Sequence, residues 1–122
     1  MKNFLVVDDD KLVRDSIEEM LLTNHYNVDL ANDGNQAINM FKKKDYDVVI
    51  TDIIMPEKEG FETISELRKI NEHIKIIAIS GGARNGIGSY LPVAENLGAK
   101  AILYKPFNQN ELMSTINKIC SH

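Results

Sequence analysis

The middle of the chain contains a run of apolar, β-branched residues that stops abruptly at a carboxylate. The run is Val48-Val49-Ile50-Thr51, and the carboxylate is Asp52. A continuous apolar run of this length is typical of a strand buried on both faces of a parallel sheet. An ionised carboxylate at the end of such a strand is costly unless cations or hydrogen-bond donors compensate it. Ligands of open α/β sheets bind at this end of the strands, so Asp52 is the first candidate functional residue.

Strand-like runs alternate with helix-like segments along the whole chain. Between the strands, apolar residues recur at helical spacing, as in the face formed by Val13, Ile17 and Leu21. This alternation predicts one α/β domain over residues 1–122, with a doubly wound, five-stranded parallel sheet and helices on both faces. Right-handed crossovers allow few topologies, of which the flavodoxin-like (βα)5 strand order 2-1-3-4-5 is one. The predicted strands cover residues 4–7, 26–30, 48–51, 74–79 and 101–104.

Local signals mark several helix boundaries. Asp10 and Asp33 are expected to be N-caps, and Asn108 with Glu111 resembles a capping box at the start of the last helix. Glycines crowd the segment 81–88, which predicts a long, mobile loop after the fourth strand and a short fourth helix near 90–97.

Composition excludes several classes of function. The net charge of −4 and the lack of a basic stripe argue against nucleic-acid binding. A single cysteine, Cys120, cannot form an internal disulfide, which fits a reducing compartment. The N-terminal apolar run is too short for a signal peptide or a membrane span, so we expect a cytoplasmic protein with no membrane partner.

Polar residues follow four of the predicted strands. Asp8 and Asp9 follow the first, Asp52 the third, Ser80 the fourth and Lys105 the fifth. In a parallel sheet these strand ends share one edge, where three carboxylates would repel one another by several kcal/mol. A hard divalent cation relieves this repulsion, and carboxylates, backbone carbonyls and water are the ligands that Mg²⁺ prefers. The pattern therefore predicts a magnesium site at this edge.

Four motifs cover essentially the whole chain: Val6-Val7-Asp8-Asp9, Thr51-Asp52-Ile53-Ile54-Met55-Pro56 with Gly60, Ile79-Ser80, and Tyr104-Lys105-Pro106-Phe107. In their order and spacing, these four motifs together resemble the receiver domain of two-component response regulators, which are CheY-like proteins.

The resemblance implies a role for each matching residue. Asp52 would accept a phosphoryl group from a phosphohistidine of a sensor histidine kinase or phosphotransfer protein, or from a small phosphodonor. The side chains of Asp9 and Asp52 and the backbone carbonyl of Ile54 would bind Mg²⁺, with Asp8 acting largely through water. Lys105 would contact the phosphoryl oxygens and, before phosphorylation, Asp52 itself.

Two further features follow from the resemblance. Ser80 would be the switch residue, whose hydroxyl donates to the phosphoryl group and draws the following loop inward. Lys105-Pro106 is a candidate cis peptide bond. Members of the family commonly have an aromatic residue three positions before the lysine. In this chain that position holds Ile102, and Tyr104 lies two residues further along the same strand. We therefore expect activation to order the 81–97 segment rather than to rotate a ring.

We expect a stand-alone receiver without an output domain, not an enzyme with a free substrate. A partner would dock on the face of the fourth helix, fifth strand and fifth helix. In the receiver family, the positions of Ile54 and Gly82 influence how water reaches the phosphoryl group. Since neither residue has a polar side chain that could position water, we expect slow self-dephosphorylation.

One alternative is an aspartyl phosphatase or phosphotransferase using Asp8, since Asp8-x-Asp10 resembles the haloacid-dehalogenase motif. The other is an interaction domain that works without phosphorylation.

Overall fold

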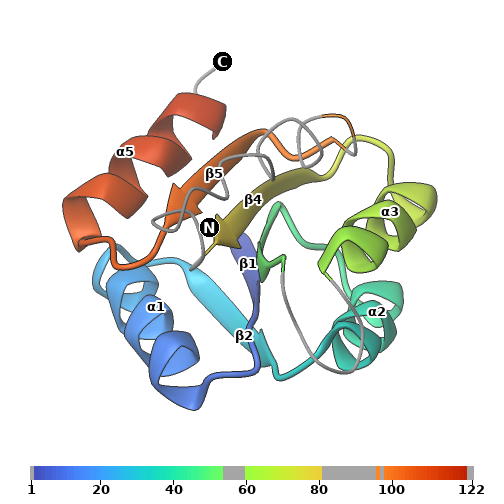
Figure 1. Cartoon of the computed structure of the whole chain (residues 1–122), viewed down its shortest axis with the longest axis horizontal. Coiled ribbons are helices and arrows are strands. Elements are labelled where there is room, and N and C mark those ends of the chain that lie inside the picture. The colour runs from blue at the N-terminus through green and yellow to red at the C-terminus, as the bar shows by residue number, and fades with distance from the viewer. Residues whose placement is uncertain (1, 54–59, 81–95, 97, 121–122) are drawn as a thin grey trace.

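The computed structural model describes residues 2–53, 60–80, 96 and 98–120. Strands and helices alternate along this part of the chain, as the sequence predicts (Figure 1). The predicted fourth helix near 90–97 and the loop before it lie almost entirely outside the described residues. The elements are β1 (Asn3–Val7), α1 (Lys11–Thr23), β2 (Asn27–Ala31), α2 (Gly34–Lys43), β3 (Val48–Asp52), α3 (Gly60–Ile70), β4 (Lys75–Ser80), β5 (Ala101–Tyr104) and α5 (Gln109–Cys120).

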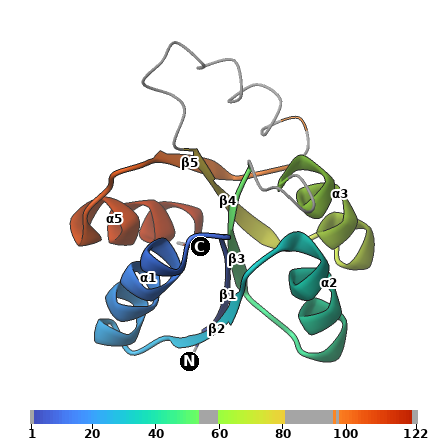
Figure 2. The same ribbon diagram turned by 60° about the horizontal axis from the view of Figure 1, so that its bottom comes forward.

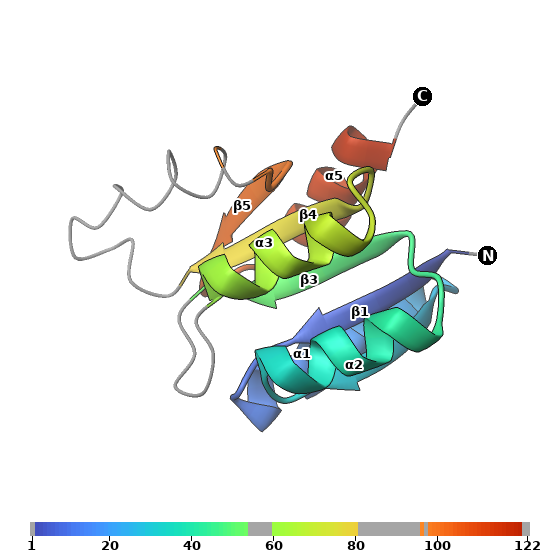
Figure 3. The same cartoon turned by 90° about the vertical axis from the view of Figure 1, so that its right-hand side faces the viewer.

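The five strands form one parallel sheet in the order β2-β1-β3-β4-β5. This confirms the predicted α/β fold and the flavodoxin-like strand order. Figure 2 shows α1 and α5 on one face of the sheet and α2 and α3 on the other. The labelled strand arrows in Figure 3 point the same way and β2 pairs parallel with β1, so the carboxyl ends of the strands share one edge. The predicted functional residues that the structure describes, Asp8, Asp9, Asp52, Ser80 and Lys105, therefore lie at that edge or directly after it.

Each face of the sheet has its own hydrophobic core. The core under α1 and α5 contains Phe4 and Ile50 from the strands, and the core under α2 and α3 contains Val49 and Leu67. Neighbouring residues of one strand point to opposite faces, so β3 is buried along its whole length. Burial on both faces is the physical reason for the unbroken apolar run that ends at Asp52.

The predicted caps are present. Asp10 caps α1 by accepting a hydrogen bond from the Leu12 amide, and Asp33 caps α2 by accepting one from Gln36. Asn108 and Glu111 bond each other's amides reciprocally, which is the capping box. No helix in the described ranges is long and apolar enough to span a membrane.

Three side chains tie the edge strand β2 to the segment before β3. The Tyr46 hydroxyl donates to Asp29 Oδ2 at 2.7 Å, and Lys44 Nζ lies 3.0 Å from the same oxygen. The Tyr46 hydrogen bond and then the Lys44 contacts lower the pKa of the Asp29 carboxyl, although partial burial opposes them. A lowered pKa stabilises the fold above the ordinary carboxyl pKa, and the stabilisation is lost as the pH falls through the folded-state value.

We expect Tyr46→Phe to lower the free energy of unfolding by about 1 kcal/mol at pH 7, because one hydrogen bond to a carboxylate is lost. The difference from the wild type should shrink as the pH falls and Asp29 becomes protonated. Urea unfolding at pH 7 and pH 3 measures both effects. The control is Lys44→Met, which removes an exposed ion pair and should cost less. A pH-independent Tyr46→Phe effect would contradict the role given to Asp29.

Candidate metal centre

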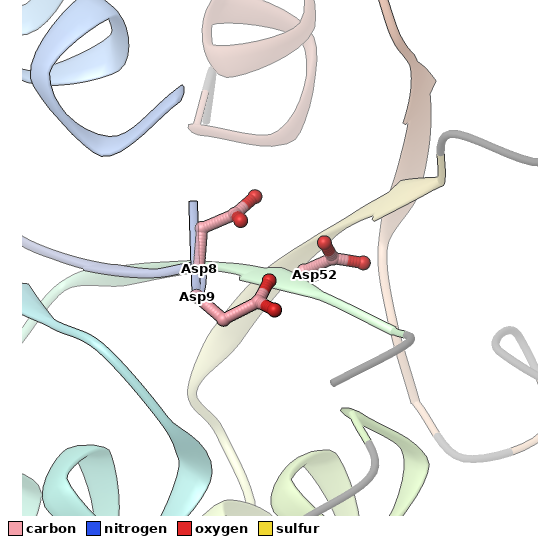
Figure 4. A group of neighbouring side chains, drawn as sticks. All are labelled: Asp8, Asp9 and Asp52. Atoms are coloured by element: carbon pink, nitrogen blue, oxygen red, sulfur yellow. The ribbon is translucent and has the colours of Figure 1, made fainter. Parts of the chain in front are cut away.

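Three carboxylates meet at the carboxyl edge of the sheet. Asp8 and Asp9 follow β1, and Asp52 is the last residue of β3, which pairs directly with β1. One carboxylate oxygen from each lies within 4.8 Å of the others. Figure 4 shows the three side chains gathered at the ends of these two strands. The structure thus brings together the acidic residues that the sequence placed at separate strand ends.

Asp8 is fully buried, whereas the Asp9 side chain is exposed. One Asp8 oxygen, Oδ1, accepts a hydrogen bond from the Asp10 amide at 2.9 Å. The other, Oδ2, is buried and accepts no hydrogen bond from the described chain. Burial, reinforced by the charge of Asp52, raises the pKa of Asp8 above its ordinary value, against the opposing effects of the Asp10 amide and Lys105. The Asp10 amide and the Lys105 ammonium therefore do not fully offset the cost of burying a negative charge at Asp8.

Lys105 brings a positive charge between the carboxylates. Its Nζ lies 3.0 Å from Asp52 Oδ2 and 3.0 Å from Asp8 Oδ2, but only the contact with Asp52 has the alignment of a hydrogen bond. Burial alone would lower the pKa of Lys105, but its close contacts with the Asp52 and Asp8 carboxylates outweigh burial and raise the pKa. The peptide bond between Lys105 and Pro106 is cis, as the sequence suggested.

Ser80 ends β4 beside this group. The residue is fully buried, and its Oγ has no hydrogen-bond partner among the described residues. Its carbonyl accepts a hydrogen bond from the Lys105 amide at 2.9 Å, so the end of β4 is joined directly to the residue that contacts Asp52. A buried hydroxyl without a partner is costly and is available to a group that enters the site.

The donor set fits a magnesium ion. Three carboxylates within reach of one another carry more negative charge than one lysine compensates, and Asp8 Oδ2 is buried with only the unaligned Lys105 ammonium, among the described residues, beside it at 3.0 Å. Carboxylate oxygens with remaining water ligands suit Mg²⁺. The third predicted ligand, the backbone carbonyl of Ile54, lies outside the described residues.

Arg14 is a site residue that the sequence analysis did not identify. Its guanidinium Nη1 donates to the carbonyl oxygen of Asp8 at 2.7 Å and so supports the loop that carries the acidic pair. In the sequence it looks like an ordinary charged residue on the outer face of α1. The one sequence feature that could have indicated its role is its position about one turn into the helix that follows Asp8 and Asp9.

Ile102, which stands where the receiver family has an aromatic residue, and Tyr104, two residues further along β5, differ in exposure. Ile102 is partly buried and packs against the core under α2 and α3. Tyr104, which points to the same face of β5, is 38% exposed. Tyr104 is therefore not a core-packing residue. The predicted ordering of 81–97 on activation concerns residues almost all of which the structure does not describe, and it stays a prediction.

Comparison with known proteins agrees with this geometry. A family model described as the response regulator receiver domain matches residues 4–117. A probable transcriptional regulator, ycf29 of Porphyra purpurea, is 35% identical over 121 residues, which is 96% of this chain and 56% of the relative. Response regulator MprA of Mycobacterium leprae is 34% identical over 94% of this chain and 49% of its own length. The chain thus spans about half the length of these curated relatives.

Solved structures are similar over almost the full chain. The chemotaxis protein CheY4 of Vibrio cholerae superposes with a TM-score of 0.91 at 28% identity, covering 98% of both chains. Response regulator protein TrrA of Thermotoga maritima, solved in complex with Mg²⁺-BeF, has a TM-score of 0.84 at 35% identity, covering 98% of this chain and 99% of its own. With the family model covering most of the chain and the acidic residues gathered where the sheet topology requires them, this protein belongs to the response regulator receiver domain family of two-component systems.

Proposed function

We propose that Asp52 is the phosphoacceptor of this receiver domain. The observation that carries the proposal is the position of Asp52 at the end of β3, hydrogen-bonded to Lys105 and within reach of two further carboxylates. A carboxylate oxygen of Asp52 attacks the phosphorus of a phosphohistidine. The new O–P bond forms as the N–P bond breaks, and the imidazole leaves with the bonding electron pair. The product is an acyl phosphate on Asp52 and an unmodified histidine on the donor.

Asp9 and Asp52 would hold Mg²⁺ through their side chains, with Asp8 acting largely through water. When bound, the ion supplies charge neutralisation for the phosphoryl group and aligns it for displacement. The under-compensated charge at Asp8 supports this assignment. The Mg²⁺-BeF complex of TrrA, a relative of nearly equal length, is consistent with it.

Lys105 and Ser80 respond to the modified carboxylate. The Lys105 ammonium, 3.0 Å from Asp52 Oδ2, would turn to the phosphoryl oxygens once that carboxylate is phosphorylated. The Ser80 hydroxyl, buried without a partner, would donate to the same oxygens. Because the Ser80 carbonyl accepts from the Lys105 amide, movement of either residue is transmitted to the other. These two residues therefore link phosphorylation to the ends of β4 and β5.

The phosphodonor would be a sensor histidine kinase or a phosphotransfer protein, and the output would be a partner protein on the face formed by the fourth helix, β5 and α5. The domain would not turn over a free substrate. Its only reactions would be phosphorylation from a donor and slow self-dephosphorylation. The slow rate is predicted from the side chains at positions 54 and 82, which lie outside the described residues.

Mass-spectrometric location of the phosphoryl group after incubation with acetyl phosphate tests the function. We expect Mg²⁺-dependent modification of Asp52 and none in excess EDTA. Modification of Asp8 would instead favour the aspartyl phosphatase or phosphotransferase reading. That outcome disagrees with the full burial of Asp8 and with its hydrogen bond to the Asp10 amide. No Mg²⁺-dependent modification of any residue would favour an interaction domain that works without phosphorylation.

A further inference from the structure

A second polar pocket lies at the opposite edge of the sheet from the candidate metal centre. Its volume is about 400 Å³, and it is formed by the turn after α3, the start of β4 and the segment before β5. Figure 3 shows α3 running away from the strand arrowheads toward this edge. Lys75 begins β4 and Ser80 ends it, and a rise of 3.3 Å per residue separates the two ends by about 17 Å. The pocket is therefore separate from the phosphorylation site.

Positive charge predominates among the described residues that line this pocket. Arg68, Lys75 and Lys100 are cationic, and Glu72 is the one carboxylate among the described lining residues. The His73 ring lies 3.5 Å from that carboxylate, in the same exposed turn. The whole chain carries a net charge of −4, so the local charge is opposite in sign to the rest of the molecule. Such a local excess attracts anions.

Among the described residues, Lys75 and Lys100 have no partner of opposite charge. No carboxylate of the described residues lies within ion-pair distance of either ammonium group. The Lys100 amide donates to the Ile76 carbonyl at 2.7 Å, which holds the segment before β5 against the start of β4. Backbone pairing therefore fixes the two lysines beside the same pocket.

Gly98 makes room for the arginine. Its φ of +106° is in the region that favours glycine, and a Cβ at this position would overlap the Arg68 guanidinium. Arg68 Nη2 also donates to the Glu72 carbonyl at 3.1 Å. The hydrogen bond to the turn thus restrains the guanidinium, which packs closely over Gly98, before it meets any ligand, and this reduces the entropy cost of binding.

We propose that this pocket binds a small anion of the diphosphate class. An arginine fork matches phosphate oxygens, and lysines supply additional point charges. The volume is within the range of small-molecule sites and exceeds the space of a single phosphate ion. The proposal does not depend on phosphorylation of Asp52, because none of its residues belongs to that site.

An NMR titration of the whole chain with pyrophosphate tests the proposal. The buffer contains EDTA and no Mg²⁺, so the three carboxylates of the metal centre repel the anion and do not compete for it. Sodium chloride keeps the ionic strength constant. We expect saturable amide shifts confined to residues 68–76 and 98–101. A parallel titration with ADP distinguishes recognition of the diphosphate alone, which gives equal affinity, from additional contacts to a nucleoside, which give higher affinity.

Lys75→Met and Lys100→Met should each raise the Kd for pyrophosphate by about tenfold, because each removes one charged hydrogen-bond donor. The matched control is Lys42→Met on α2, an exposed lysine outside the pocket that changes the net charge equally. Its Kd should stay within about twofold of the wild type. Equal weakening in the control, linear shifts without saturation, or no shifts at about 10 mM pyrophosphate would each overturn the proposal.

Discussion

Replacing Asp52 by asparagine should abolish phosphorylation of the domain by acetyl phosphate. The amide has nearly the shape of the carboxylate but is not a nucleophile, and it contributes no negative charge to the metal site. We expect labelling to fall to the level seen in EDTA, while thermal unfolding shows that the variant is folded. Intact-mass spectrometry of a time course in Mg²⁺ measures the loss. Undiminished labelling of Asp52→Asn would refute the assignment of the acceptor.

The control for this variant is Asp33→Ala, which also removes one carboxylate. Asp33 caps α2 and lies outside the group of three carboxylates. Its loss should cost about 1 kcal/mol of stability and leave labelling unchanged. A drop in labelling for both variants would point to a general effect of charge or stability, not to the chemistry of Asp52.

Asp8→Asn should separate stability from function. Asp8 is fully buried and burial raises its pKa, so above the ordinary carboxyl pKa the ionised side chain lowers the stability of the folded state relative to the unfolded chain. Without Mg²⁺, the amide should therefore raise the midpoint of thermal unfolding. Mg²⁺-dependent labelling of Asp52 should fall by about 10- to 100-fold, because a group that supports the metal is lost. Thermal unfolding in EDTA and labelling in Mg²⁺ measure the two effects.

Asp10→Ala is the matched control two residues away. It removes the N-cap of α1 and should lower stability by about 1 kcal/mol without preventing labelling. The two variants are thus expected to move stability in opposite directions. A loss of stability in Asp8→Asn would mean that the contact of Asp8 with Lys105 outweighs both its burial and its repulsion by Asp52.

Much of the fold could be predicted because local pattern and tertiary environment agree. The β3 run is apolar on both faces because both faces are covered, and the caps at Asp10, Asp33 and Asn108 act within their own turns. The boundaries shift by a residue, as at β2, which begins at Asn27 instead of Tyr26. Exposure of the last strand residues was not predictable, because Ile102 and Tyr104 point to the same face but end in different surroundings.

The candidate site was predictable only in part. Parallel strands end at one edge of the sheet, so the topology alone brings together the polar residues that follow the apolar strands. These residues are Asp8, Asp9, Asp52, Ser80 and Lys105. The hydrogen bond from Arg14 to the Asp8 carbonyl depends on the conformation of the arginine side chain, and no sequence pattern indicates it. The same holds for the basic pocket, whose lysines lie at the start of β4 and just before β5 and whose arginine belongs to α3.

The sequence by itself determined the class of fold, the order of its elements and the identity of the acidic site, because each rests on periodicity or on residues at strand ends. Only the tertiary structure decided how the charges balance. It buried Asp8 while leaving Asp9 exposed, placed one lysine 3.0 Å from two carboxylates, and left Ser80 Oγ without a partner among the described residues. The physical reason is that desolvation and Coulomb energies depend on distances across the sheet. Those distances separate residues that are far apart in the chain, so no local pattern in the sequence reveals them.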